Sequence, residues 1–158
     1  MDCYETVLKY SKEYELDPFL VMAVIKTESN FKTDATSDKS AMGLMQITDD
    51  TAKWCCEKLG IETYEKQMLY ESDFSIRLGA FYLDYLLEKY DGDLSCAICA
   101  YNAGMGNADK WLKDSKYSPD GKTITNTPFK ETTGYLNKVK FNYKVYEILY
   151  GGSKDENV

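Results

Sequence analysis

Residues 17–28 have the sequence DPFLVMAVIKTE, which predicts a helix that is apolar on every face for two turns. Asp17 is a typical N-cap residue, and the proline that follows it is favoured at the first position of a helix. A helix that is apolar all round must be surrounded by other elements. We therefore expect this segment to be the central, buried helix of a helical domain.

Similar patterns run along most of the chain and predict a mainly α fold. Apolar residues at spacings of three and four, capping residues and stop glycines predict further helices at residues 3–15, Thr51–Leu59, a segment capped by Asp73 and ending at Tyr90, Leu94–Ala103, and about Lys130–Tyr150. The residues of the last helix expected to face inward are Leu136, Val139, Tyr143, Tyr146 and Leu149. Asp120-Gly121 is compatible with a hairpin turn.

The length of 158 residues corresponds to one domain. We assign residues 1–150 to this domain and interpret residues 151–158, GGSKDENV, as a polar tail or linker. The chain does not begin like a signal peptide, and it has no run of about 20 apolar residues that could cross a bilayer. These features fit a cytoplasmic protein or a module of a longer exported one, and the polar tail favours the module.

The charge balance excludes several kinds of chemistry. Lysine and arginine number 19, aspartate and glutamate 26, so the net charge is −7, and the chain has no histidine. A Ser-His-Asp triad, a Cys-His dyad and a histidine-ligated zinc or haem site are therefore excluded. An acidic chain is also a poor nucleic-acid binder, because the phosphate backbone repels it. Catalysis would have to use carboxylates, amides, hydroxyls or thiols.

The chain has five cysteines: Cys3, Cys55, Cys56, Cys96 and Cys99. Their odd number prevents complete internal pairing. The last four could in principle ligate zinc, but adjacent cysteines fit a tetrahedral site poorly, so we favour small buried hydrophobic residues. A disulfide between the two pairs is left open by the sequence.

Glu28 does not fit the apolar helix that contains it. Val21, Val24, Ile25 and Glu28 share one helical face, so the carboxyl closes an apolar stripe. Burial and the negative end of the helix dipole both disfavour its anion. A glutamic acid that keeps its proton near neutral pH is suited to general acid catalysis. The alternative is a structural pair between Glu28 and a lysine at the helix end, Lys26 or Lys32.

Three short motifs accompany this glutamate: ESNF at 28–31, GLMQI at 43–47 and AYNAG at 100–104. They provide Gln46, Tyr101 and Asn102, which are uncharged hydrogen-bonding groups in apolar surroundings. Together with a buried carboxylic acid, such groups suit a neutral ligand that bears hydroxyl and acetamido groups, such as an amino sugar. Tyrosines can also stack on sugar faces.

The order and spacing of these motifs resemble those of the soluble lytic transglycosylase domain, a bacterial peptidoglycan-cleaving family. Two further segments share the resemblance: Thr51-Ala52, which follows GLMQI, and ETTGYLNKV at 131–139. The resemblance covers about residues 15–150. It implies a lysozyme-like (goose-type) single helical domain with a central buried helix and a substrate cleft. Two positions depart from the family pattern: Thr48-Asp49 replaces a Met-Pro pair, and Leu136 replaces a valine.

The resemblance also implies roles for individual residues. Glu28 corresponds to the sole catalytic acid/base. The residues implied to bind substrate are Ser37, near the catalytic carboxyl; Gln46, a cleft-lining amide; Tyr101, which would hold the glutamate; Asn102, facing the sugar's acetamido group; and Glu131, an acidic residue lining the cleft. No metal or cofactor is implied.

The implied reaction cuts the β-1,4 bond between N-acetylmuramic acid and N-acetylglucosamine in peptidoglycan. Most glycosidases use two carboxylates, whereas only one suitably buried carboxylate is evident here. In a single-acid scheme, protonated Glu28 donates to the glycosidic oxygen, and its carboxylate then accepts the proton of the muramic acid C6 hydroxyl. That hydroxyl closes a 1,6-anhydro ring, and no water is consumed.

The sequence is also compatible with two alternative functions. A goose-type lysozyme-like hydrolase would share Glu28 but use water, with Asp34, Asp38 or Asp49 as the activating carboxylate. A non-catalytic peptidoglycan-binding module of a larger envelope machine would gain nothing from a desolvated acid. The expected partners are peptidoglycan glycan strands and further domains, since an acidic chain is not held on an anionic cell wall by charge. We expect a monomer at the cell envelope or outside the cell.

Overall fold

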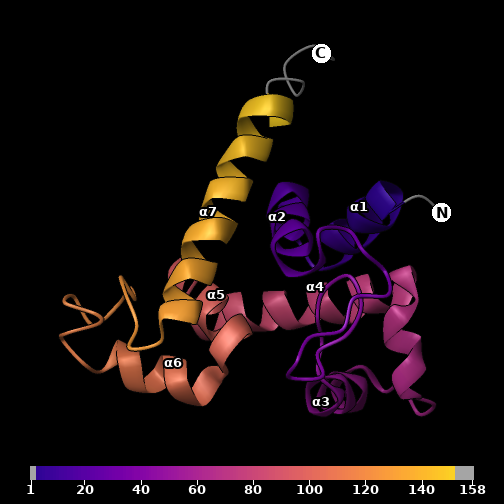
Figure 1. The fold of residues 1–158 in the computed structure, drawn as a ribbon, viewed down its shortest axis with the longest axis horizontal. Helices are drawn as coiled ribbons and strands as arrows, with labels where there is room; N and C mark the ends of the chain where they lie inside the picture. The colour runs from indigo at the N-terminus through magenta and orange to yellow at the C-terminus, as the bar shows by residue number, and fades with distance from the viewer. Residues whose placement is uncertain (1–2, 152–158) are drawn as a thin grey trace.

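The computed structural model describes residues 3–151, which form helices joined by loops (Figure 1). The helices in these residues are α1 (Cys3–Glu13), α2 (Pro18–Ser29), α3 (Asp49–Leu59), the 3-10 helix η1 (Lys66–Tyr70), α4 (Ser72–Lys89), α5 (Leu94–Ala103), α6 (Met105–Leu112) and α7 (Lys130–Tyr150). The only β pairings within 3–151 are two isolated bridges, Thr36 with Met42 and Met42 with Ile47. The expected mainly α fold is confirmed. The predicted tail lies outside the described residues except for Gly151.

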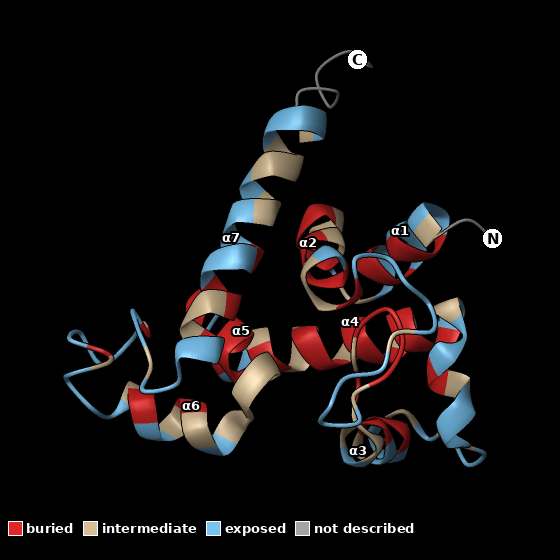
Figure 2. Ribbon diagram, viewed as in Figure 1, coloured by how far each residue is buried: buried red, intermediate tan, exposed pale blue. Residues whose placement is uncertain are grey.

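The predicted buried helix is α2, and its ends form as its sequence indicates. The Asp17 carboxylate accepts a hydrogen bond from the backbone N–H of Phe19 at 2.8 Å, and Pro18 occupies the first helical position. Six apolar residues of α2 are buried: Phe19, Leu20, Val21, Ala23, Val24 and Ile25. The helix packs against α1 and along α7, and Figure 2 shows buried residues concentrated where α2, α4 and α5 face each other.

The chain turns sharply after α2. Asn30 and Phe31 have positive φ angles of 51° and 63°, so the helix stops directly after Glu28 and Ser29. Ser29 then ties the helix end to the following loop, because its hydroxyl donates to the Leu44 carbonyl at 2.8 Å. This bond links the ESNF and GLMQI motifs and fixes the loop beside Glu28.

The GLMQI segment is held by close packing against two other elements. Gly43 has a φ of 76°, and a Cβ atom there would collide with the backbone carbonyl of Leu69. Met45 is fully buried and lies against Gly79 of α4, where a Cβ would collide with the methionine side chain. The two glycines therefore allow the loop to approach η1 and α4, which positions Gln46.

Three local expectations, about a helix cap, an inward-facing residue and a hairpin, are not met. Glu71, not Asp73, is the N-cap of α4; Asp73 lies in the first turn and accepts hydrogen bonds from Tyr10 and Lys9 of α1. Leu149 is 62% exposed, because the last turns of α7 extend past α2 (Figure 1). Asp120-Gly121 forms a turn without strands among the described residues, and Asp120 accepts from the backbone N–H of Lys122 and Thr123.

Four cysteines belong to the core, as the sequence favours. Cys55, Cys56, Cys96 and Cys99 are buried and in no disulfide. Burial raises the pKa of Cys55, Cys96 and Cys99 to about 12, which keeps these thiols protonated and unreactive. Within residues 3–151, none of the helices has the length and apolar character needed to span a membrane.

Candidate active site

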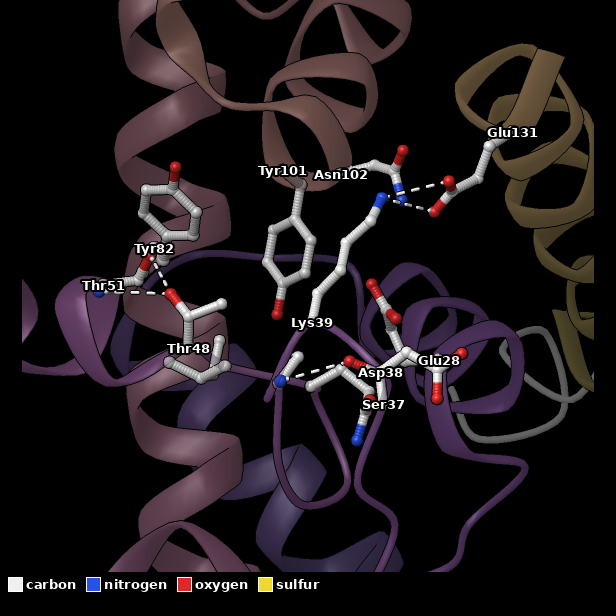
Figure 3. A pocket seen from close by; sticks show the side chains of 13 residues that line it. Glu28, Ser37, Asp38, Lys39, Thr48, Thr51, Tyr82, Tyr101, Asn102 and Glu131 are labelled. Atoms are coloured by element: carbon white, nitrogen blue, oxygen red, sulfur yellow. Dashed lines mark hydrogen bonds and ion pairs between the residues drawn. The ribbon is translucent and has the colours of Figure 1, made fainter. Parts of the chain in front are cut away.

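A cavity of about 440 Å³ opens beside the end of α2 (Figure 3). It is lined from α2, the loop after it, α3, α4, α5 and the start of α7. The lining residues are Glu28, Ser37, Asp38, Lys39, Ala41, Gln46, Ile47, Thr48, Thr51, Tyr82, Tyr101, Asn102 and Glu131. All six residues that the sequence analysis singled out, from Glu28 to Glu131, therefore line one cavity. Helix packing brings them together from distant parts of the chain.

Glu28 lies in the last turn of α2, at the wall of this cavity. Its Oε1 accepts a hydrogen bond from the Tyr135 hydroxyl at 2.7 Å. Burial raises the pKa of Glu28 from an ordinary 4.5 to about 7; the Tyr135 hydrogen bond lowers it in part, and the negative charge of Glu131 adds a smaller rise. A large fraction of Glu28 is thus protonated near neutral pH, which a general acid requires.

The alternative of a structural ion pair for Glu28 is wrong. Lys26 donates to Asn30 on the outside of α2, and Lys32 is exposed in the following loop. No ion pair to Glu28 is found within residues 3–151. Its Oε2 makes no hydrogen bond to another residue in that part of the chain, so this oxygen is available to a ligand.

The hydroxyl that donates to Glu28 belongs to Tyr135 and not, as the resemblance implies, to Tyr101. The Tyr101 hydroxyl donates to the Met45 carbonyl at 2.8 Å and so anchors the GLMQI segment instead of Glu28. Its ring lies 5.4 Å from that of Tyr82, and the two rings form an aromatic wall of the cavity. Tyr135 is four residues after Glu131 in the ETTGYLNKV segment, but a helical pattern alone does not show which tyrosine reaches a residue 107 positions away.

Gln46 and Asn102 each have one polar atom of the side-chain amide hydrogen-bonded within the protein. Gln46 Nε2 donates to the carbonyls of Ala35 and Gly43, both at 3.0 Å. Asn102 Oδ1 accepts from the Thr132 hydroxyl at 2.9 Å. The other polar atoms, Gln46 Oε1 and Asn102 Nδ2, have no hydrogen bond to a described residue. The cavity thus offers one fixed acceptor and one fixed donor, as a ligand with an acetamido group requires.

Ser37 and Glu131 lie at the rim of the cavity. The Ser37 hydroxyl oxygen accepts from the Ala41 backbone N–H at 3.1 Å, which leaves its proton free to donate to a ligand. Glu131 accepts from Lys39 at 3.0 and 3.1 Å. Sequence reasoning missed Lys39, since a lone lysine in a polar loop carries no signal of this contact.

The departure at Thr48-Asp49 has a local structural explanation. Thr48 is the N-cap of α3, and its hydroxyl accepts from the Thr51 backbone N–H at 3.4 Å. Both threonines line the cavity, so the wall is built from hydroxyl-bearing residues. Asp49 points elsewhere and accepts from Tyr64 and Lys53.

Comparisons with known proteins agree with these motifs. Residues 5–124 match the family described as the transglycosylase SLT domain. The chain is 30% identical over 149 residues to the soluble lytic murein transglycosylase of Salmonella typhimurium. This alignment covers 93% of this chain and 23% of the Salmonella protein. The chain is 37% identical over 123 residues to the transglycosylase of Enterobacteria phage PRD1, covering 78% of this chain and 42% of that protein.

Solved structures show the same fold. An inactive glutamate-to-glutamine mutant of the lytic transglycosylase Slt from Pseudomonas aeruginosa superposes with a TM-score of 0.81 at 35% identity, covering 93% of this chain and 24% of that one. The 70-kDa soluble lytic transglycosylase from Escherichia coli gives 0.83 at 27% identity, with the same coverage. The expected lysozyme-like helical fold is confirmed. The chain spans about a quarter of the length of these structures.

Proposed function

Because the chain belongs to the transglycosylase SLT domain family, we propose that it is a peptidoglycan lytic transglycosylase. It would cleave the β-1,4 bond between N-acetylmuramic acid and N-acetylglucosamine and form 1,6-anhydro-muramic acid. The observation that carries this proposal is Glu28, a carboxylic acid with a pKa of about 7 at the wall of a cavity lined by uncharged hydrogen-bonding groups. The names of the relatives and the inactivity of the Pseudomonas glutamate-to-glutamine mutant support it.

In the first step Glu28 acts as a general acid. With Oε1 held by Tyr135, Oε2 carries the proton toward the cavity and donates it to the glycosidic oxygen. The bond from this oxygen to C1 of muramic acid breaks, and the N-acetylglucosamine side leaves as an alcohol. Positive charge develops at C1, where the substrate's own acetamido oxygen can stabilise it. Asn102 Nδ2 is the donor available to orient this acetamido group.

In the second step Glu28 acts as a general base. Its carboxylate takes the proton of the muramic acid C6 hydroxyl while O6 bonds to C1, which closes the 1,6-anhydro ring and restores the acid. One proton leaves Glu28 and one returns, so no water is consumed and no cofactor is required. A pKa near 7 serves both steps, because neither protonation state is strongly disfavoured at neutral pH.

A hydrolase is the second candidate, since one observation allows it. Of the three aspartates considered as water activators, Asp38 lines the cavity, whereas Asp34 and Asp49 do not. Mass spectrometry of fragments released from purified peptidoglycan separates the two reactions. Anhydro ends, which lack the mass of one water, support the transglycosylase. Reducing ends that disappear in Asp38→Asn support the hydrolase, and binding without any release supports a non-catalytic module.

Tyr135→Phe tests whether the hydrogen bond from Tyr135 assists Glu28 as the general acid. Loss of one hydrogen bond to a buried carboxyl is expected to lower kcat about 10-fold at neutral pH. Since this hydrogen bond lowers the Glu28 pKa, its loss raises that pKa further, and the alkaline limb of the pH–rate profile moves to higher pH.

Tyr143→Phe is the matched control for Tyr135→Phe. It removes another hydroxyl–carboxylate bond between α7 and the start of α2, from Tyr143 to Asp17 at 3.1 Å, away from the cavity. It is expected to lower stability without moving the pH profile. Identical profiles for Tyr135→Phe and the wild type would show that Tyr135 does not act through Glu28.

The setting of this activity is also part of the proposal. We place the protein at the cell envelope, where its proposed substrate, peptidoglycan glycan strands, is found. Because the chain spans about a quarter of its Salmonella relative, further domains or an envelope machine beside this domain are proposed as well. We propose that the domain itself acts as a monomer, which light scattering of the purified protein would test.

A further inference from the structure

An ion pair crosses the rim of the cavity. The Lys39 ammonium lies 3.0 and 3.1 Å from the two carboxylate oxygens of Glu131, joining the loop after α2 to the first turn of α7, 92 positions away (Figure 3). The two side chains are 74% and 65% exposed. An exposed pair of this kind contributes little to folding stability, so a charged ligand can compete for either partner.

Among the described residues that line the cavity, Lys39 is the one basic residue. The other ionisable carboxyl groups of the lining belong to Glu28, Asp38 and Glu131, and the whole chain carries a net charge of −7. A ligand carboxylate that enters this cavity is therefore repelled by Asp38 and Glu131, and by Glu28 whenever it is ionised, whereas Lys39 attracts it. The ammonium has three N–H donors, which is enough to keep a contact with Glu131 and add one to a ligand.

The position of the pair fits a particular part of the proposed substrate. Asn102, the proposed donor to the acetamido group on C2, is hydrogen-bonded to Thr132, the neighbour of Glu131 in the chain. In muramic acid the adjacent ring carbon, C3, bears a lactyl ether that ends in a carboxyl or continues as a peptide with its own carboxylates. Asn102, Lys39 and Glu131 line the same cavity, so a sugar whose C2 group faces Asn102 can direct its C3 substituent toward the Lys39–Glu131 pair.

We infer that Lys39 is a specificity-determining residue that binds the carboxylate carried on the C3 substituent of muramic acid. This inference rests on the proposed function, since it takes the substrate from it. Lys39 exchanges part of its contact with Glu131 for the substrate carboxylate. The site thereby favours carboxylate-bearing peptidoglycan over glycans in which the same position is uncharged.

The test measures binding without turnover, in a Glu28→Gln background. The probes are soluble muramic-acid-containing glycan fragments in three forms: with intact peptide stems, with the peptides removed so that lactyl carboxylates remain, and with all carboxylates converted to neutral amides. Lys39→Gln is expected to weaken binding of the carboxylate-bearing fragments roughly 3- to 10-fold and to leave the neutral form unchanged. Lys39→Arg should retain most of the affinity.

Lys130→Gln is the matched control, because Lys130 is an exposed lysine next to Glu131 that does not line the cavity. It should bind all three forms as the parent does. Comparison of the first two probes shows whether the peptide or the lactyl carboxylate is bound. The inference would be overturned if Lys39→Gln weakened binding of charged and neutral fragments equally, or if the Glu28→Gln protein bound neither kind of fragment. If the protein with Glu28 intact releases no fragments from peptidoglycan, but the Glu28→Gln protein still binds carboxylate-bearing fragments selectively, only the proposed function is contradicted.

Discussion

Glu28→Gln is expected to reduce the release of fragments from peptidoglycan at least about 10³-fold, the largest effect of any single change to this chain. Glutamine keeps the shape of the side chain and can still accept the hydrogen bond of Tyr135. It cannot donate a proton to the glycosidic oxygen or take one from the C6 hydroxyl, so both proposed steps fail together. Release of fragments from purified peptidoglycan, followed by mass spectrometry, provides the measurement.

Glu57→Gln provides the control for this loss. Glu57 is an exposed glutamate on α3 that does not line the cavity, and the same change there should leave the rate unaltered. Circular dichroism and thermal melting of both variants should match the wild type near pH 5, where Glu28 is protonated. Near-normal cleavage by Glu28→Gln would mean that another group supplies the proton, and the single-acid scheme would then be wrong.

The elements that could be predicted from sequence are those with strong local signals. The start of α2 follows from Asp17-Pro18, and the end of α3 from Gly60, which has a φ of 66°. The signal is weak for α6, which begins between Gly104 and Gly106 and is held by the packing of Ala108 and Trp111. Such tertiary packing overrides a poor helix propensity and cannot be read from a short segment.

Asp73 shows the opposite error, a strong local signal overridden by a long-range contact. An aspartate before an apolar stretch resembles an N-cap, yet its carboxylate is bound by Tyr10 at 2.7 Å and by Lys9. Leu149 fits the helical stripe of α7, but a stripe does not show where the neighbouring helix ends. In both cases the deciding partner lies far away in the sequence.

The residues of the candidate site also differ in whether their role follows from a local sequence signal or from tertiary packing. Glu28 could be found because a carboxyl on the apolar face of a buried helix is anomalous within a single segment. Tyr135 and Lys39 could not be assigned their contacts, because these depend on how α7 approaches α2 and the loop that follows it. The motifs predicted that Gln46, Tyr101 and Asn102 lie in one site. Only the structure shows which of their side-chain atoms have no hydrogen bond to a described residue and can contact a ligand.

The raised pKa of Glu28 also predicts a pH-dependent loss of stability. In the unfolded chain Glu28 has its ordinary pKa of 4.5, and in the folded protein about 7. Between these values the folded state holds the proton more tightly, so the stability gained below 4.5 is lost as the pH rises through 7. The free energy of unfolding should fall by about 2–3 kcal/mol from this group between about pH 5 and pH 8.

Urea unfolding of the wild type and Glu28→Gln at both pH values isolates this contribution, because all other titrating groups are common to the two proteins. Near pH 5 the two should be similar in stability; near pH 8 the glutamine variant should be the more stable by about 2–3 kcal/mol, because the wild type must hold a buried carboxylate there. Glu57→Gln should show no such divergence. A wild-type protein that gains stability relative to Glu28→Gln as the pH rises would mean that the folded state stabilises the Glu28 anion. In that case the residue would be a carboxylate before substrate binds, and the proton for the first step would have to come from elsewhere.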